Sequence, residues 1–185
     1  MTNEDMRSKK FIFIPFCLIC QAFQARGIVR YGWHGTIKPI MEELIKQDIN
    51  LVQMPCPESK FGGYEKGLKR GPNSIETYDT PAFRQICEEL ALETIDKIKA
   101  ILSNGYEVIA ILGIEYSPSC AVNYQYTNKG TIHRQGIFIE ILRTALEKEG
   151  IEIPFVGINR RGIKKSLMEI KKLFDKSKQS TLKLS

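Results

Sequence analysis

Four short apolar runs alternate with amphipathic segments along this chain, and this alternation limits the folds open to it. The runs are predicted strands, and they cover Phe11–Phe16, Asn50–Met54, Glu107–Ile114 and Glu152–Ile158. The third run is the most continuously apolar, which is typical of a central strand covered on both faces. Strands that alternate with helices form parallel sheets with helices on both faces. The sequence therefore predicts a single α/β domain, Rossmann-like, on a mainly parallel four-stranded sheet.

Helical periodicity fills the intervals between these runs. We expect helices from about Thr36, from Thr80 to Gly105, from Gln135 to Glu149 and from Gly162. Thr80 is a predicted N-cap, and Pro81 follows it at the first helical position. From Ser59 to Asp79 the chain is rich in Gly, Lys and Pro without a sustained period, so we expect a long loop that could serve as a lid over a site. We place the domain at residues 1–176 and a basic tail at 177–185.

Composition favours a cytoplasmic protein. The five cysteines are an odd number at wide, irregular intervals, unlike the disulfide framework of a small secreted domain. The basic start followed by FIFIPFCLIC imitates a secretory signal, but Pro15 interrupts the apolar run, and Glu4 and Asp5 weaken the positive charge. We interpret it as a buried first strand. Elsewhere no apolar run approaches the roughly 18 residues of a membrane helix, so we expect no membrane partner.

The net charge of +6 has two interpretations. Part of the excess lies in the last helix and the tail, where a solvated surface explains it better than a nucleic-acid interface does. The other interpretation depends on Arg26, Arg30, Arg160 and Arg161, which would bring positive potential to the edge where the strands end. Such an edge would suit an anionic substrate or a phosphate backbone, which makes tRNA a candidate partner.

Three cysteines follow predicted strands directly. Cys17, Cys56 and Cys120 come after the first, second and third strands. The crevice outside the carboxyl ends of parallel strands is where ligands bind, so neighbouring strands would bring the three thiols together. Thiolates are soft ligands that suit iron–sulfur clusters and zinc. The sequence therefore predicts an iron–sulfur site with one exposed iron, whereas Cys87 is expected to face the core.

The identity of a fourth ligand stays open. Cys20 lies three residues after Cys17, and His34 and His133 are the two imidazoles of the chain. If Cys20 bound as well, the site would be a closed four-cysteine centre for electron transfer or a structural zinc site. Cys20 could equally face the core. We expect both histidines to be surface residues.

Four stretches carry a resemblance to a known family. They are Cys17-Leu18-Ile19, Cys56-Pro57-Glu58 followed by Gly62-Gly63, Ser117-Pro118-Ser119-Cys120, and Gly136-Ile137 with the helix that leads to Glu149-Gly150-Ile151. In this order they resemble the bacterial thiouracil desulfurases and their relatives. The Cys-Pro-Glu and Ser-Pro-Ser-Cys motifs together are the specific part of the resemblance.

The resemblance implies a cofactor, a reaction and a set of site residues. Cys17, Cys56 and Cys120 would hold a [4Fe–4S] cluster whose fourth iron takes the sulfur of a thiolated nucleobase, a small-molecule partner. The reaction would be non-redox desulfuration, with the iron as Lewis acid and sulfur acceptor while water attacks the thiocarbonyl carbon. Glu58 matches the acid/base carboxylate, and Ser117 matches the hydroxyl that orients water or substrate. The protein would act as a monomer or a homodimer.

Chemistry supports these roles, and alternatives remain beside them. An attacking water needs a base whose pKa is raised by partial burial, and Glu58 is two residues from a predicted ligand. Glu58 could instead pair with Lys60 or Lys66, and Ser119 could replace Ser117. The family usually has Gly where this chain has Cys20, and the loop from Arg30 to Gly35 lacks the family's aspartate. The alternative functions are a non-catalytic iron–sulfur or zinc binding module and a tRNA thiouridine desulfurase.

Overall fold

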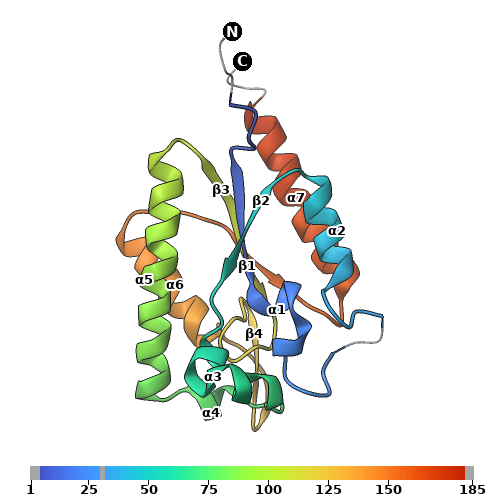
Figure 1. The fold of residues 1–185 in the computed structure, drawn as a ribbon, viewed down its shortest axis with the longest axis vertical. Helices are drawn as coiled ribbons and strands as arrows, with labels where there is room; N and C mark the ends of the chain where they lie inside the picture. The colour runs from blue at the N-terminus through green and yellow to red at the C-terminus, as the bar shows by residue number, and fades with distance from the viewer. Residues whose placement is uncertain (1–4, 30–31, 182–185) are drawn as a thin grey trace.

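A parallel sheet of four strands lies at the centre of the protein (Figure 1). The computed structural model describes residues 5–29 and 32–181, with side chains as far as residue 175. The strand order is β2-β1-β3-β6, and the strands are β1 (Lys10–Pro15), β2 (Asn50–Met54), β3 (Glu107–Ile114) and β6 (Phe155–Ile158). The predicted α/β class and parallel four-stranded sheet are confirmed, and β2 and β3 have the predicted bounds.

Helices cover both faces of this sheet, as predicted. The long ones are α2 (Lys38–Lys46), α5 (Pro81–Ser103), α6 (Ile137–Lys148) and α7 (Ile163–Thr181). Helices α5 and α6 lie on one face, and α2 and α7 lie on the other (Figure 1). Helix α7 includes the first residues of the expected tail, and residues 182–185 of that tail lie outside the described residues.

Side-chain alternation along the strands separates two apolar layers. Phe13 packs toward α5 and α6, whereas its neighbours Ile12 and Ile14 pack toward α2 and α7, because successive side chains of a strand point to opposite faces. Cys87 of α5 is fully buried in the first layer, as expected. Thr80 caps α5, since its Oγ1 accepts a hydrogen bond from Phe83 N at 3.3 Å.

The expected loop from 59 to 79 is largely helical, and that prediction was wrong. The segment forms α3 (Pro57–Lys69) and α4 (Ile75–Tyr78). Two adjacent glycines hid α3 from sequence reasoning, because glycine is a poor helix former. Gly63 has a φ of 75°, which divides α3 into two short pieces and leaves neither with a sustained apolar period.

The region after β3 contains an antiparallel hairpin that the sequence reasoning missed. It consists of β4 (Tyr124–Thr127) and β5 (Gly130–His133). The turn at Asn128-Lys129-Gly130 between Tyr-, Thr- and Ile-containing runs was the available signal. The last strand, β6, begins at Phe155 rather than at Glu152.

Two short elements complete the fold, α1 (Phe16–Ile19) and the 3-10 helix η1 (Gln21–Phe23). Both lie with α3, α4 and β4 near the ends of the strands, at the opposite end of the sheet from the start of β1 and the end of α7 (Figure 1).

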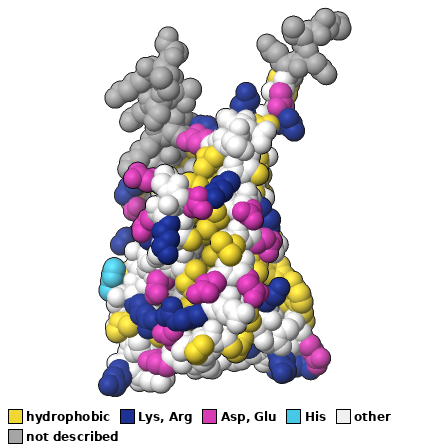
Figure 2. Space-filling model, turned by 90° about the vertical axis from the view of Figure 1, so that its left-hand side faces the viewer, with side chains coloured by type: hydrophobic (Ala, Val, Ile, Leu, Met, Phe, Trp, Pro, Cys, Tyr) yellow, Lys and Arg dark blue, Asp and Glu magenta, His cyan; other side chains and the backbone are white. Residues whose placement is uncertain are grey.

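The outer face of the α5 layer carries charges of both signs (Figure 2). Lys97 pairs with Glu93 at 2.7 Å, and Lys99 pairs with Glu149 of the neighbouring segment at 2.6 Å. The positive excess of the chain therefore does not gather on this face. Across the described residues, no helix combines the length and the hydropathy that a bilayer crossing needs.

Candidate metal centre

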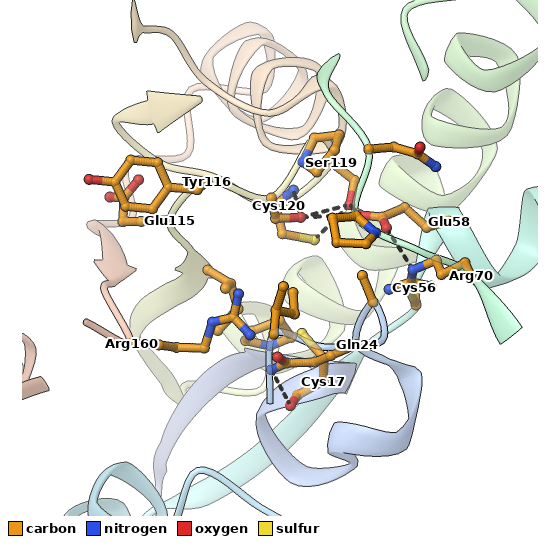
Figure 3. A pocket seen from close by; sticks show the side chains of 18 of the residues that line it. Cys17, Gln24, Cys56, Glu58, Arg70, Glu115, Tyr116, Ser119, Cys120 and Arg160 are labelled. Carbon is orange, nitrogen blue, oxygen red and sulfur yellow. Dashed lines mark hydrogen bonds and ion pairs between the residues drawn. The ribbon is translucent and has the colours of Figure 1, made fainter. Parts of the chain in front are cut away.

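The ends of β1, β2 and β3 bring Cys17, Cys56 and Cys120 to one cavity (Figure 3). Cys17 lies in α1, Cys56 is the N-cap of α3, and Cys120 lies in the turn after β3. The three strands are neighbours in the sheet and run parallel, so the segments that follow them lie at the same edge. The cavity between them has a volume of about 350 Å³.

The Cys56 thiol acts electrostatically on the other two thiols. Burial raises the pKa of the Cys17 thiol to about 12, and the neighbouring Cys56 adds to the increase. Burial also raises the pKa of Cys120 far above its usual range, with further contributions from Cys56 and Cys17. The pKa of the Cys56 thiol is also raised, first by burial and then by the Glu58 carboxylate. Ionising these thiols without a cation is therefore unfavourable, and a cationic centre would offset both desolvation and mutual repulsion.

The donor set of three thiols suits an iron–sulfur cluster, because thiolates are its usual protein ligands. All five cysteines are free thiols. Within residues 5–29 and 32–181, no three His, Cys, Asp or Glu side chains lie close enough together to bind one metal ion. A [4Fe–4S] cluster offers a different iron to each thiolate, so its ligands lie farther apart than those of one ion. Cys17, Cys56 and Cys120 could hold such a cluster.

The other candidate ligands lie away from this cavity. Cys20 follows the last residue of α1 and does not line the cavity wall. His34 and His133 are exposed, and neither lines the cavity. Three thiols, rather than four, thus face the enclosed space.

Glu58 lies in the first turn of α3, and its carboxylate accepts hydrogen bonds from the turn that carries Cys120. It is 9% exposed. Its Oε1 accepts hydrogen bonds from Ser119 Oγ at 2.8 Å and from Ser117 Oγ at 3.2 Å. Ser117 Oγ in turn accepts a hydrogen bond from Cys120 N at 3.1 Å, and Ser119 Oγ lies 3.4 Å from Cys120 Sγ. Both serines, which the sequence left as alternatives, thus contact the same carboxylate oxygen.

Arg70 is the ion-pair partner of Glu58, in place of the lysines considered above. Its Nε lies 3.1 Å from Glu58 Oε2, and another guanidinium nitrogen donates to the Phe23 carbonyl. In a straight helix these two residues would be about 18 Å apart, at 1.5 Å per residue. The break at Gly63 allows the chain to return, which explains why sequence spacing gave no signal for this pair.

Glycines make room for the turn from Ser117 to Cys120. A Cβ on Gly136 would overlap the Ser119 carbonyl group, and one on Gly113 would overlap the Cys120 carbonyl oxygen. The turn is therefore packed directly against the start of α6 and against β3. This close approach gives Gly136, part of the resemblance above, a physical role.

Glu115 is a second buried carboxylate that sequence reasoning missed. It is 4% exposed and lines the cavity. Its oxygens accept hydrogen bonds from Asn123 N at 3.1 Å, Tyr124 N at 2.9 Å and Asn123 Nδ2 at 2.7 Å. These bonds fix the chain just after Cys120, and Gly157 leaves the space that the carboxylate fills.

Two of the four arginines expected at this edge line the cavity. They are Arg160 and Arg161, and the Arg161 guanidinium lies 5.9 Å from the ring centre of Tyr126. Tyr126 stacks on Tyr116 with ring centres 4.6 Å apart. Arg26 is exposed outside the cavity, and Arg30 lies outside the described residues.

Comparisons with known proteins gave two similarities. The chain is 26% identical over 149 residues to an uncharacterized protein of Methanocaldococcus jannaschii, covering 80% of this chain and 88% of that protein. It is also similar to the solved structure of TudS, a [4Fe–4S]-dependent thiouracil desulfidase. That match has 18% identity and a TM-score of 0.48, and it covers 88% of this chain and 98% of the other. No family model matches the chain. At these values neither comparison assigns an activity to the chain.

Proposed function

We propose that this protein removes sulfur from a thiolated nucleobase, of the thiouracil type, at a [4Fe–4S] cluster held by Cys17, Cys56 and Cys120. The observation that carries the proposal is the joint lining of one cavity by three thiols and a buried carboxylate, with Cys20 absent from its wall. Three ligands on a four-iron cluster leave one iron for the substrate. When bound, the cluster would supply a Lewis acid for which a thiocarbonyl sulfur is a soft ligand.

The chain's own residues would manage the proton in this reaction. Water would add to the thiocarbonyl carbon and lose one proton to Glu58, which would pass it to the departing sulfur. The remaining hydroxyl proton of the adduct would follow to the sulfur as the C–S bond breaks and the carbonyl forms. Overall, thiocarbonyl plus water gives carbonyl plus hydrogen sulfide, without net oxidation or reduction. Arg70 holds Oε2 of Glu58, so Oε1 stays with Ser117 and Ser119 beside Cys120. Ser117 Oγ, which donates to Glu58 Oε1 and accepts from Cys120 N, would orient the water or the substrate.

The cofactor part of the proposal is tested by substituting all five cysteines one at a time. Anaerobically purified wild-type protein should be brown and contain about four iron atoms per chain. Cys17→Ala, Cys56→Ala and Cys120→Ala should each lose the iron. Cys20→Ala and Cys87→Ala are the matched controls and should keep it. A colourless protein with one zinc, or loss of iron in Cys20→Ala, would contradict an open three-cysteine site.

The catalytic part of the proposal is tested by Glu58→Gln. This variant should keep its iron and lose about 10²- to 10⁴-fold in sulfide release from 2-thiouracil or 4-thiouridine, the range expected for a general acid/base. Glu65→Gln on the same helix, whose native carboxylate pairs with Lys69 at 2.6 Å, is the control and should behave like wild type. A wild-type protein that holds its cluster and releases no sulfide would favour the non-catalytic binding module.

An RNA-directed form of the same reaction is the second candidate. It is favoured by Arg160, Arg161 and Tyr126 in the cavity wall, because guanidinium and aromatic groups bind phosphates and stacked bases. Binding of tRNA containing 4-thiouridine, with an affinity that falls steeply with salt, would support it. Sulfide release from the free base that is as fast as release from the tRNA, together with weak tRNA binding, would favour the small-molecule substrate.

A further inference from the structure

Two buried glutamines lie close together in sequence at the edge of the candidate site. Gln21 is 1% exposed and Gln24 is 5% exposed. In each, the amide nitrogen donates to a backbone carbonyl, Gln21 to Thr36 O at 3.1 Å and Gln24 to Cys17 O at 3.4 Å. In each, the amide oxygen is buried and has no hydrogen-bond partner. Gln24 lines the cavity and Gln21 does not.

The unused atom of Gln24 is an acceptor. Carbonyl oxygens only accept hydrogen bonds, so the atom that faces Cys17 O must be the amide nitrogen. This contact identifies Oε1 as the buried amide atom without a partner. Figure 3 shows this amide beside Cys17, on the wall of the cavity.

A buried acceptor without a donor is costly, and such groups are rare in folded proteins. We therefore expect a ligand in the cavity to donate a hydrogen bond to Gln24 Oε1. The contact to Cys17 O is long at 3.4 Å and the terminal torsion of glutamine is broad, so a rotation of the amide can present Oε1 to a ligand in the cavity.

We propose that Gln24 is a specificity-determining residue whose Oε1 accepts a hydrogen bond from the ring N3–H, the N–H that lies between the reacting thiocarbonyl group and the second carbonyl of the ring. The site would then select thioamides of the type NH–C(=S) over their N-alkylated analogues. This inference rests on the proposed function, since that function places the thiocarbonyl beside the three cysteines. Gln21 is the matched control, because it shares the burial and the unpartnered oxygen but not the cavity.

The test measures binding of sulfur-free ring analogues, so it does not depend on turnover. Dissociation constants for uracil, 1-methyluracil and 3-methyluracil are measured with the cluster-loaded protein by calorimetry. The wild type should bind 3-methyluracil, which lacks the N–H between the two carbonyls, about 10- to 100-fold more weakly than 1-methyluracil. Gln24→Met, which keeps the length of the side chain, should reduce this contrast to a few-fold. Gln21→Met should keep the wild-type contrast.

Each outcome decides the inference. A wild type that does not prefer 1-methyluracil overturns it even if Gln24→Met fails to fold. If Gln24→Met keeps the preference for 1-methyluracil over 3-methyluracil, steric exclusion of the methyl group explains the preference and the inference is wrong. The inference is also wrong if Gln24→Met and Gln21→Met lose the preference equally. Binding contrast without sulfide release would support the role of Gln24 while refuting the proposed reaction. Sulfide release without binding contrast would do the reverse.

Discussion

The layer under α5 and α6 and the cavity at the strand ends are both buried, but different forces stabilise them. Phe83, Phe138 and Leu142 in the layer are fully buried among apolar neighbours, and this stabilisation depends on area rather than on direction. Around the cavity, Glu58, Ser119 and Arg70 contact one another through a few polar atoms, whose energy depends on angle and distance. The layer supplies stability, and the cavity supplies defined atomic positions.

Two cysteines illustrate the same contrast. Burial raises the pKa of the Cys87 thiol to about 12 and raises that of Cys120 as well. Cys87 lies among apolar side chains of the layer, whereas Cys120 lies beside Ser119 and near two other thiols. Burial alone therefore does not identify a candidate ligand, and the neighbours do.

The largest expected effect is in the apolar layer. Phe138→Ala removes a fully buried ring and should lower the free energy of unfolding by about 3–5 kcal/mol. Urea unfolding of the protein, followed by circular dichroism, measures this change. Leu92→Ala on the outer side of α5, where the side chain is 62% exposed, is the control and should have little effect. A loss below about 1 kcal/mol in Phe138→Ala would mean that the layer is not the main source of stability.

A smaller effect is expected where the layer meets the cavity. Gly136→Ala places a Cβ against the Ser119 carbonyl group, so the turn or the start of α6 must shift, at a cost of about 1–3 kcal/mol. The shift should also reduce iron retention, because the turn carries Cys120. Gly35→Ala, where a Cβ would meet nothing within 4 Å, is the control. Unchanged iron content in Gly136→Ala would show that the turn does not need this close packing.

The cap of α5 should contribute less than the turn. Thr80→Ala removes the hydroxyl that accepts from Phe83 N and should cost about 1 kcal/mol of unfolding free energy. Thr80→Ser keeps a hydroxyl at the same place and should recover most of the loss in the same urea titration. Equal losses in the two variants would assign the effect to the threonine methyl group instead.

The smallest effect on stability is expected from the ion-pair cluster of Asp79, Arg84 and Arg134 near the start of α5. Hydrogen bonds from Arg84 and then Arg134 lower the pKa of Asp79 below its usual value, with both nitrogens 2.7 Å from the carboxylate. A lowered folded-state pKa gives stability that is present above the unfolded pKa of about 3.9 and is lost as the pH falls through the folded value. The contribution should be below about 1 kcal/mol, since these side chains are partly exposed.

Asp79→Asn measures that contribution. The gap in unfolding free energy between wild type and this variant should narrow as the pH is lowered from about 6 toward about 3. Asp96→Asn, at an exposed position of α5, should change stability by less than about 0.5 kcal/mol. If the difference in unfolding free energy between wild type and Asp79→Asn widens as the pH falls, the pKa of Asp79 is not lowered in the folded protein and the interpretation is wrong.

The sheet was predictable because its strands are short, apolar and separated by periodic helices. The bounds of β2 and β3 follow from the sequence, as does the N-cap at Thr80. The hairpin β4–β5 and helix α3 were missed, because neither buries a continuous apolar stripe that periodicity could reveal. Their local signals were turn residues and a helix-start proline, which are weaker than a hydrophobic period.

By itself, the sequence placed Cys17, Cys56 and Cys120 after strands, and parallel pairing of those strands then requires the three residues to meet at one edge. The tertiary structure alone decided which side chains face the enclosed space. It brought Arg70 back to Glu58 through the break at Gly63, turned Gln24 toward the cavity, and left Cys20 outside it. The physical reason is that the succession of strands and helices along the chain follows from local patterns, whereas strand order in the sheet and the direction of one polar side chain depend on contacts between distant segments.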